Sequence, residues 1–250
     1  MTTSYHKKGN TQGRPLSAGN TRDYKEFSTG EHYHLYNRGN DKMDIFRDAQ
    51  DYSVFLQRLS MALGKETQPA TSRAPLDQLC QGAPLTATAP ERSRVRVTPF
   101  ESGTFSLICY CLMPNHFHLL LRQEKDTPLS ALLLKVLTSY SMYFNRKYQH
   151  VGHVFQDRFR AVHIGSDTQL KHISAYIHLN PKVATFVRDA AKWKYSSYPE
   201  YLTQDEREMC DKTIVLEQFR NARDYERFVQ DSFEDIRERK NVARELMLDE

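Results

Sequence analysis

Two histidines separated by one residue are the most chemically suggestive feature of this 250-residue sequence. His116 and His118 flank Phe117 in the stretch PNHFHLLL, which has the apolar content of a β-strand. Side chains alternate between the two faces of a strand, so both imidazoles are expected on one face, opposite Phe117. Neutral imidazole is a common metal ligand, and two histidines leave coordination positions open, as a catalytic metal requires. The pattern indicates a divalent-metal site, although two histidines on a half-exposed strand would give the same spacing.

A tyrosine and an asparagine one helical turn apart form the second candidate group. Tyr176 and Asn180 lie in the stretch YIHLNP, at positions i and i+4 of an expected helix, so they share one face with His172 one turn earlier. A phenol has a pKa of about 10 and needs activation by a metal or a base before it attacks as a nucleophile. Tyr176 is therefore a candidate nucleophile, and Asn180 is a candidate additional metal ligand. The alternative is a packing tyrosine followed by an asparagine that caps the helix before Pro181.

Four strands and three helices are expected to position these residues. Apolar and aromatic residues predict strands over residues 32–38, 105–113, 116–122 and 159–164. Apolar stripes predict helices over residues 48–63, 130–148 and 167–180, the last one capped by Ser166 or Asp167 and ending before Pro181. The order of these elements is that of a split βαβ arrangement. We therefore expect an α+β fold, a ferredoxin-like antiparallel sheet with helices on one face, followed by a C-terminal helical extension.

Composition divides the chain into three parts. Residues 1–27 are polar and rich in Gly, Ser, Thr, Lys and Arg, which is typical of a flexible arm. Residues 28–202 are expected to form the main domain, in which the proline-rich stretch 64–99 is a loop or insert. Residues 203–250 are a charged tail with one expected amphipathic helix, packed on the body or on a partner. The apolar residues of that helix are Tyr225, Phe228, Val229, Phe233 and Ile236.

The charge distribution favours a polyanionic partner. The net charge is +4, but residues 122–194 hold 12 Lys and Arg against 5 Asp and Glu, a net +7. Residues 200–250 hold 9 against 15, a net −6. A basic centre suits nucleic acid, although ordinary surface patterning gives the same imbalance.

Cysteine usage and apolar runs bear on the compartment. The four cysteines form no C-x-x-C pair, and two of them lie in an apolar run, so a reduced, cytoplasmic setting is expected. The most apolar run falls far short of the roughly 20 residues that a membrane span needs. The N-terminus also lacks the apolar stretch of a signal peptide. We therefore expect no membrane association.

Several motifs, taken in order, resemble one known family. The PNHFHLLL strand, the tyrosine helix ending in Asn-Pro and the loop GHVFQDRF are similar to those of REP-associated tyrosine transposases. These belong to the single-tyrosine HUH transposases of bacterial insertion sequences. The stretches YHLYNRG (33–39), DIFR (44–47) and WKYSSY (193–198) match as well. The resemblance runs from about residue 30 to residue 202 and is interrupted by the insert.

The resemblance implies a mechanism. His116 and His118 would bind Mg²⁺ or Mn²⁺, and Asn180, where related enzymes often have glutamine, would complete the metal shell. Tyr176 would attack the scissile phosphate and become linked to the 5′-phosphate, releasing a 3′-OH, and a second strand would reverse the step. The implied protein is a transposase, a metal-dependent single-strand DNA endonuclease and strand transferase that acts on hairpin-forming repeats. It would be cytoplasmic, associated with the nucleoid when bound to DNA, and a monomer or homodimer.

Five further residues are candidates for DNA contacts. Guanidinium groups bind phosphate bidentately, so arginines in the matching motifs are favoured, together with one lysine of the basic centre. We interpret His34, which falls on a motif position, as structural or DNA-facing. The candidates are Arg38, Lys147, Arg158, Arg160 and His34.

Two alternative functions remain open at this stage. The first is a non-catalytic nucleic-acid-binding module on the same fold, which would bind DNA without metal-dependent cleavage. The second is a metal hydrolase in which His34, His116 and His118 form a three-histidine site. That enzyme would remain active without Tyr176.

Overall fold

The computed structural model describes residues 27–65, 97–203 and 209–246. Residues 1–26 of the expected arm and residues 66–96 of the expected insert lie outside the described residues. The main elements, in chain order, are β1 (His32–Arg38), α1 (Ala49–Ala62), β2 (Phe105–Met113), β3 (His116–Gln123), α2 (Leu129–Tyr148), β4 (Arg160–Ile164) and α3 (Asp167–Val183). The helices α4 (Tyr198–Leu202), α5 (Thr213–Leu216), α6 (Ala222–Asp231) and α7 (Phe233–Leu246) follow. All four strands and all three helices expected in the main domain are present.

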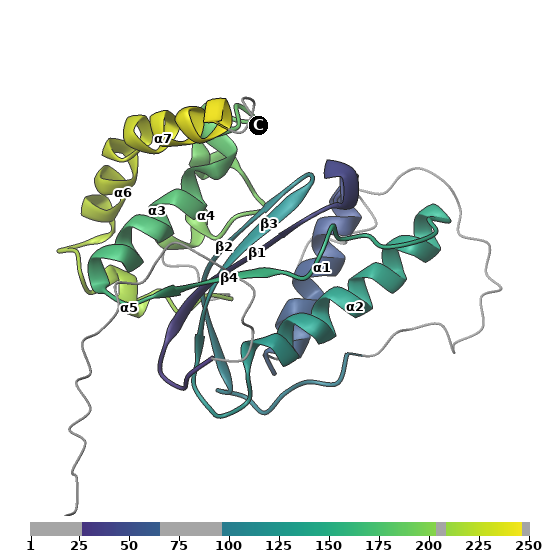
Figure 1. Ribbon diagram of the computed structural model, residues 1–250. Coiled ribbons are helices and arrows are strands. Elements are labelled where there is room, and N and C mark those ends of the chain that lie inside the picture. The colour runs from purple at the N-terminus through teal and green to yellow at the C-terminus, as the bar shows by residue number, and fades with distance from the viewer. Residues whose placement is uncertain (1–26, 66–96, 204–208, 247–250) are drawn as a thin grey trace, which may run out of the picture.

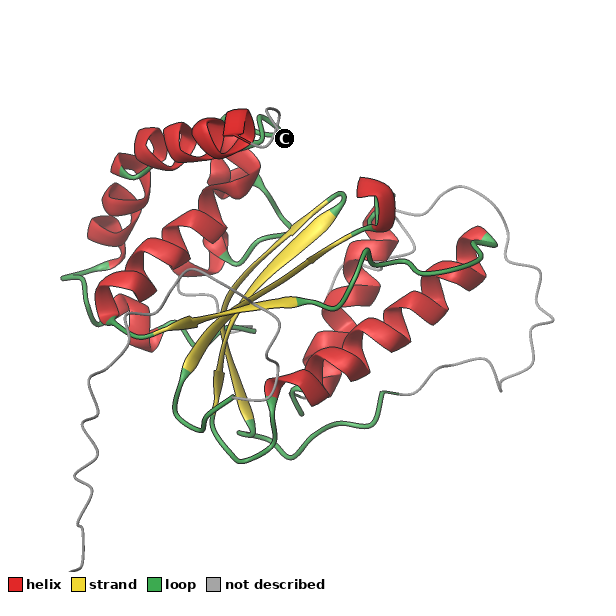
Figure 2. Ribbon diagram, in the orientation of Figure 1, coloured by secondary structure: helices red, strands yellow, loops and turns green. Residues whose placement is uncertain are grey.

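The four strands form one antiparallel sheet in the order β2-β3-β1-β4 (Figure 2). Because β3 lies between β1 and β2, the β1-α1-β2 unit is a split βαβ unit. The second unit, β3-α2-β4, is split in the same way by β1. This strand order, with α1 and α2 as the connecting helices, confirms the expected ferredoxin-like α+β fold with a helical C-terminal extension.

Helices cover both faces of the sheet, so the expectation of helices on one face is wrong. The helices α1 and α2 pack together on one side, and α3 packs on β2 and β3 from the other (Figure 1). The alternation along β3 shows the division, because Phe117 contacts Phe55 of α1 while His118 contacts Tyr176 of α3. The C-terminal extension provides helices that cover α3, which makes burial of this second face possible.

The helix that carries Tyr176 is longer than the sequence predicts. Its start is as expected, since the side chain of Ser166 accepts a hydrogen bond from the backbone of Gln169. Its end is not, because α3 continues through Pro181 to Val183. A proline in the last turn costs the helix one backbone hydrogen bond, and the carbonyl of Asn180 still accepts from the backbone N–H of Ala184. Asn180 therefore lies within the helix and does not end it.

The part of the C-terminal tail where the sequence predicts one amphipathic helix, with Tyr225 and Ile236 on its apolar stripe, forms two helices, α6 and α7. The break falls at Ser232, and both α6 and α7 contact α3. Tyr225 and Val229 of α6 are fully buried. Within the described residues, no helix is long and apolar enough to span a membrane.

A buried hydrogen-bond network fastens α3 to the extension. His178 contacts the hydroxyl of Tyr225 through Nδ1 at 2.7 Å and the hydroxyl of Ser197 through Nε2 at 2.9 Å. Tyr225 also donates to Ser174, one turn earlier on α3. Burial lowers the pKa of His178 to about 3, so its imidazole is neutral at physiological pH. The network therefore fixes α3 without a buried charge.

We expect the protein to lose stability as the pH falls below about 6.5, because the unfolded chain then takes up a proton that folded His178 refuses. A folded pKa of about 3 against an unfolded value of 6.5 makes the free energy of unfolding about 2 kcal/mol lower at pH 5 than at pH 8 from this group alone. Urea unfolding of the wild type and of His178→Gln at both pH values measures this contribution. The variant should show the smaller difference, while His153→Gln, at an exposed position, should match the wild type. Equal pH dependence in all three proteins contradicts the assignment.

Candidate active site

The two histidines of the HxH pattern share the face of the sheet that α3 covers. In the β1–β3 register, Tyr36 pairs with His118 and Arg38 pairs with His116, and paired residues of antiparallel strands point to the same side. The imidazole centroids of His116 and His118 lie 5.1 Å apart, with the rings nearly perpendicular. His118 is 6% exposed, whereas His116 is half-buried. The pair therefore sits where the sheet passes from the core to the surface.

Tyr176 meets this pair from the opposite layer. Its ring centroid lies 5.4 Å from that of His118 and 6.1 Å from that of His34, in edge-to-face orientations. Burial raises the pKa of Tyr176, and the neighbouring Asn180 amide and the more distant Arg38 guanidinium oppose the rise. The phenol is thus protonated at neutral pH and needs a cation or a base to become nucleophilic.

Asn180 is a buried amide with no hydrogen-bond partner among the described residues. It is 1% exposed, and neither its Oδ1 nor its Nδ2 makes a hydrogen bond. Its amide still lies near enough to Tyr176 to favour the phenolate, but without hydrogen-bond geometry. An unsatisfied buried amide costs about 1–3 kcal/mol of stability, so its presence points to a bound ligand or ion as the missing partner.

His34 lies inside this cluster rather than on the DNA-accessible surface. It is 5% exposed, and its Nε2 lies 2.9 Å from Nδ1 of His118. Burial lowers the pKa of His34 to about 4, so it is neutral at physiological pH. This placement favours the structural interpretation of His34 over a DNA contact. Across residues 27–65, 97–203 and 209–246, no three His, Cys, Asp or Glu side chains converge as a metal site.

Arg38 and Arg160 border the cluster. Both side chains are exposed, and Arg160 pairs with Tyr36 across β1 and β4, so it faces the same side as His118. Arg158 is exposed in the loop that precedes β4. The site thus has a basic rim around a nearly neutral interior of aromatic and imidazole rings.

Lys147 is placed elsewhere, on α2 beyond the opposite face of the sheet. Its ammonium forms ion pairs with Asp48 at 2.6 Å and with the fully buried carboxylate of Asp51 at 2.8 Å. Burial alone would lower the pKa of Lys147, but these carboxylates raise it well above its usual value. Asp51 also accepts from the hydroxyls of Tyr143 and Tyr148. The structure therefore gives Lys147 a role in joining α1 to α2, and its DNA contact stays a prediction.

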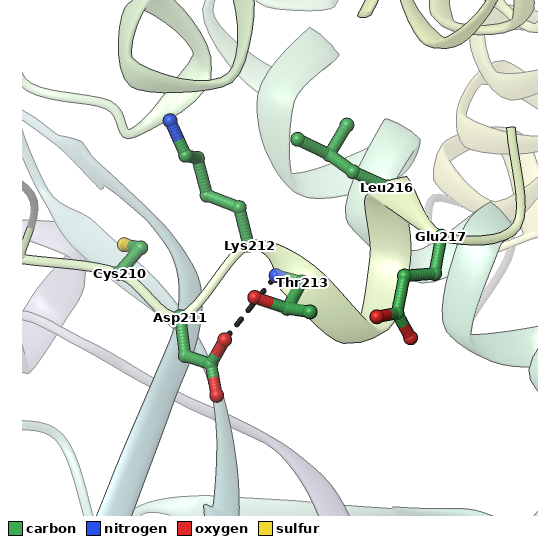
Figure 3. Close-up of a pocket in the computed structure, with 6 residues that line it drawn as sticks. All are labelled: Cys210, Asp211, Lys212, Thr213, Leu216 and Glu217. Atoms are coloured by element: carbon green, nitrogen blue, oxygen red, sulfur yellow. Dashed lines mark hydrogen bonds between the residues drawn. The ribbon is translucent and has the colours of Figure 1, made fainter. Parts of the chain in front are cut away.

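A surface pocket of about 410 Å³ near α5 shares no residue with this cluster (Figure 3). The backbone N–H of Thr213 donates to the Asp211 carboxylate within it. Burial raises the pKa of the Cys210 thiol well above its usual value, so the thiol is not a nucleophile. The pocket is lined by Cys210, Asp211, Lys212, Thr213, Leu216 and Glu217.

Sequence reasoning gave no role to two neighbours of the histidines. Tyr36 packs beside both His34 and His118, with ring centroids 5.0 Å and 5.8 Å away. Its alternation with His34 and Arg38 in the strand HYHLYNR was the available signal. Asn115, in the turn between β2 and β3, has its side-chain oxygen 2.6 Å from Nδ1 of His116. No spacing rule reveals that contact, because it depends on the geometry of the turn.

Comparison with known proteins supports the resemblance seen in the sequence. Residues 96–180 match the sequence model of IS200-like transposases, a span that includes His116, His118, Tyr176 and Asn180. The resemblance to tyrosine transposases of the insertion-sequence class is thereby confirmed over this segment. No curated protein matches the chain. A solved structure of a REP-associated tyrosine transposase bound to a REP hairpin is similar, with 13% identity and a TM-score of 0.48, covering 74% of this chain and 87% of that chain.

We expect Lys147→Ala to lower the free energy of unfolding by about 1–3 kcal/mol, because it leaves the buried Asp51 carboxylate without its cation. Arg146→Ala removes the same charge from the neighbouring exposed position and should change stability much less. Chemical denaturation measures both variants, and a filter-binding assay with single-stranded DNA measures their affinity. Unchanged stability with weakened DNA binding in Lys147→Ala would restore the DNA contact predicted from the sequence.

Proposed function

We propose, from the premise that residues 96–180 are an IS200-like transposase segment, that the protein is an HUH-type tyrosine endonuclease and transposase. It would cut single-stranded DNA at hairpin-forming repeats in a metal-dependent reaction and transfer the cut strand. The observation that carries this proposal is the edge-to-face contact between Tyr176 and His118, two residues from different layers of the fold. The hairpin-forming repeat follows from the resemblance of the sequence motifs.

The donor set fits a divalent cation such as Mg²⁺ or Mn²⁺. His116 and His118 offer imidazole nitrogens on one face of β3. The buried oxygen of Asn180 accepts no hydrogen bond, and a bound cation would satisfy it. A bound cation supplies Lewis-acid polarisation of the phosphate and a template for its orientation. A set of two imidazoles and one amide also leaves positions open for phosphate oxygens.

Tyr176 is the proposed nucleophile. Its hydroxyl oxygen forms a bond to the scissile phosphorus while the bond from phosphorus to the 3′ oxygen breaks, and the leaving strand ends as a 3′-OH. The resulting 5′-phosphotyrosine keeps the bond energy of the phosphodiester, so a second 3′-OH can reverse the step without ATP. Tyr176 faces histidines of its own chain, which supports an active site formed within one chain.

The basic rim suits the phosphate backbone of the DNA. Arg38 and Arg160 face the same side of the sheet as the histidines, and Arg158 precedes β4. Guanidinium groups fix the register of a strand through its phosphates, which brings one phosphate to Tyr176. We therefore assign these arginines to positioning and Tyr176 to chemistry.

A three-histidine hydrolase has less support. His34 uses its Nε2 in contact with Nδ1 of His118, so these two nitrogens face each other rather than a shared ion. The non-catalytic binding module remains the second candidate, since the same basic rim would bind DNA without cleavage. The adduct experiment below separates it from the proposed enzyme.

Incubation with labelled hairpin DNA and Mn²⁺ should give a covalent protein–DNA adduct that survives denaturing gel electrophoresis. Tyr176→Phe should abolish the adduct, because only the nucleophilic oxygen is removed. Tyr195→Phe is the matched control, since Tyr195 stacks on Tyr52 of α1, with ring centroids 3.6 Å apart, rather than on the histidines. Adduct formation by Tyr176→Phe at the wild-type level would refute the nucleophile, and its absence in all proteins despite DNA binding would favour the non-catalytic module.

We expect Arg38→Ala and Arg160→Ala each to weaken DNA binding and to flatten its salt dependence. Loss of one phosphate contact reduces the slope of log K against log[salt] by about 0.7–0.9. Titrations between low and moderate salt measure the slope. Arg223→Ala, at an exposed position of α6, should leave it unchanged. Equal slopes for all four proteins would remove these arginines from the DNA path.

A further inference from the structure

The side chain of Asn115 determines which nitrogen of His116 carries a proton. Its Oδ1 lies 2.6 Å from Nδ1 of His116, and its Nδ2 donates to the carbonyl of Lys42 at 3.2 Å. The second bond fixes the orientation of the amide, so an oxygen faces the imidazole. An amide oxygen only accepts hydrogen bonds, so Nδ1 of His116 is the donor. In the neutral ring the lone pair is then on Nε2.

His118 is engaged at the same ring nitrogen. Its Nδ1 faces Nε2 of His34 at 2.9 Å, with the ring centroids 5.1 Å apart and an interplanar angle of 26°. Both side chains are more than nine-tenths buried, so this contact has little competition from water. If His34 accepts the hydrogen bond, His118 also carries its proton on Nδ1 and its lone pair on Nε2.

We propose that Asn115 and His34 are positioning residues that hold His116 and His118 as Nδ1–H tautomers, so that both present Nε2 to the divalent cation. The inference rests on the proposed function for the cation, but the tautomers are properties of the protein alone. Metal-binding histidines usually donate their second N–H to a fixed acceptor, and loss of that acceptor commonly weakens metal binding. Here the acceptors are a turn amide and a neighbouring imidazole.

The turn that carries Asn115 is firmly held. The carbonyl of Pro114 accepts hydrogen bonds from the backbone N–H groups of Ile45 and Phe46. The carbonyl of Asn115 accepts one from the backbone N–H of Gly39. A Cβ at Gly39 would lie 2.1 Å from the carbonyl oxygen of Met43, so only glycine allows this close approach. The segment between β1 and α1 therefore anchors the amide that orients His116.

The two acceptors differ in how strictly they act. The amide oxygen of Asn115 permits only one tautomer of His116, whereas an imidazole nitrogen of His34 can either donate or accept. Loss of Asn115 should therefore release His116 into a mixture of tautomers. Loss of His34 should do the same for His118, and a glutamine at position 34 can restore an acceptor oxygen.

Nitrogen-15 NMR of the imidazoles in the metal-free protein tests the proposal directly. The wild type should show His116 and His118 as Nδ1–H tautomers. Asn115→Ala should change the pattern of His116 alone, and His34→Ala that of His118 alone. His34→Gln and Asn115→Asp retain an acceptor and should keep the wild-type patterns, while His153→Ala, at an exposed position, is the control for general perturbation.

Mn²⁺ titration followed by electron paramagnetic resonance provides the second readout. Asn115→Ala and His34→Ala should weaken Mn²⁺ binding by about 10- to 100-fold, and the acceptor-retaining variants should recover most of it. Nε2–H tautomers in the wild type, or alanine variants with wild-type tautomers and affinity, would overturn the inference. Failure of the proposed function is separately visible, as the absence of a Tyr176-dependent adduct from a wild type with the expected tautomers.

Discussion

The antiparallel register between β1 and β3 is the constraint on which the site depends. It sets Tyr36 opposite His118 and Arg38 opposite His116, so that rings and guanidinium groups gather on one face. A shift of one residue would turn either strand over and place the apolar residues Leu35 and Phe117 under α3 instead. The register is held by the β2–β3 hairpin on one side and by β4 on the other, which leaves β3 and β1 in the centre of the sheet. The proposed site thus lies on the two central strands of the sheet.

The second requirement is that α3 stays on this face, and the extension meets it. Alternation along strands predicted from sequence which face His116 and His118 would occupy, and helical spacing correctly paired Tyr176 with Asn180. The same reasoning failed at Pro181, because a helix tolerates a proline in its last turn when the following backbone N–H groups close the end. It also expected helices on one face of the sheet only. The apolar stripe of the tail correctly included Tyr225, but no local pattern indicated that its partner would be His178. Contacts between distant segments, such as that pair, depend on packing rather than on local pattern.

The interior of the site combines features that oppose stability. Two buried imidazoles and a phenol are desolvated together, and the Asn180 amide is buried without a hydrogen bond. Natural folds concentrate such unfavourable features where a ligand or reaction compensates for them. Burial also raises the pKa of Tyr176, so the proposed nucleophile stays protonated until an opposing charge is present. A phenol that ionises only beside a cation would not react with stray electrophiles when no DNA is bound.

The basic side chains on the two sides of the sheet have different surroundings. Between α1 and α2, the charge of Lys147 is compensated by ion pairs with Asp48 and Asp51. On the other side, Arg38 and Arg160 are exposed at the rim of the ring cluster. A positive charge that already has buried carboxylate partners gains little from a phosphate, whereas an exposed guanidinium loses little water in binding one. Net basic character in the centre of the sequence therefore overstates the exposed positive charge, and the proposed DNA contacts have most support at the exposed arginines.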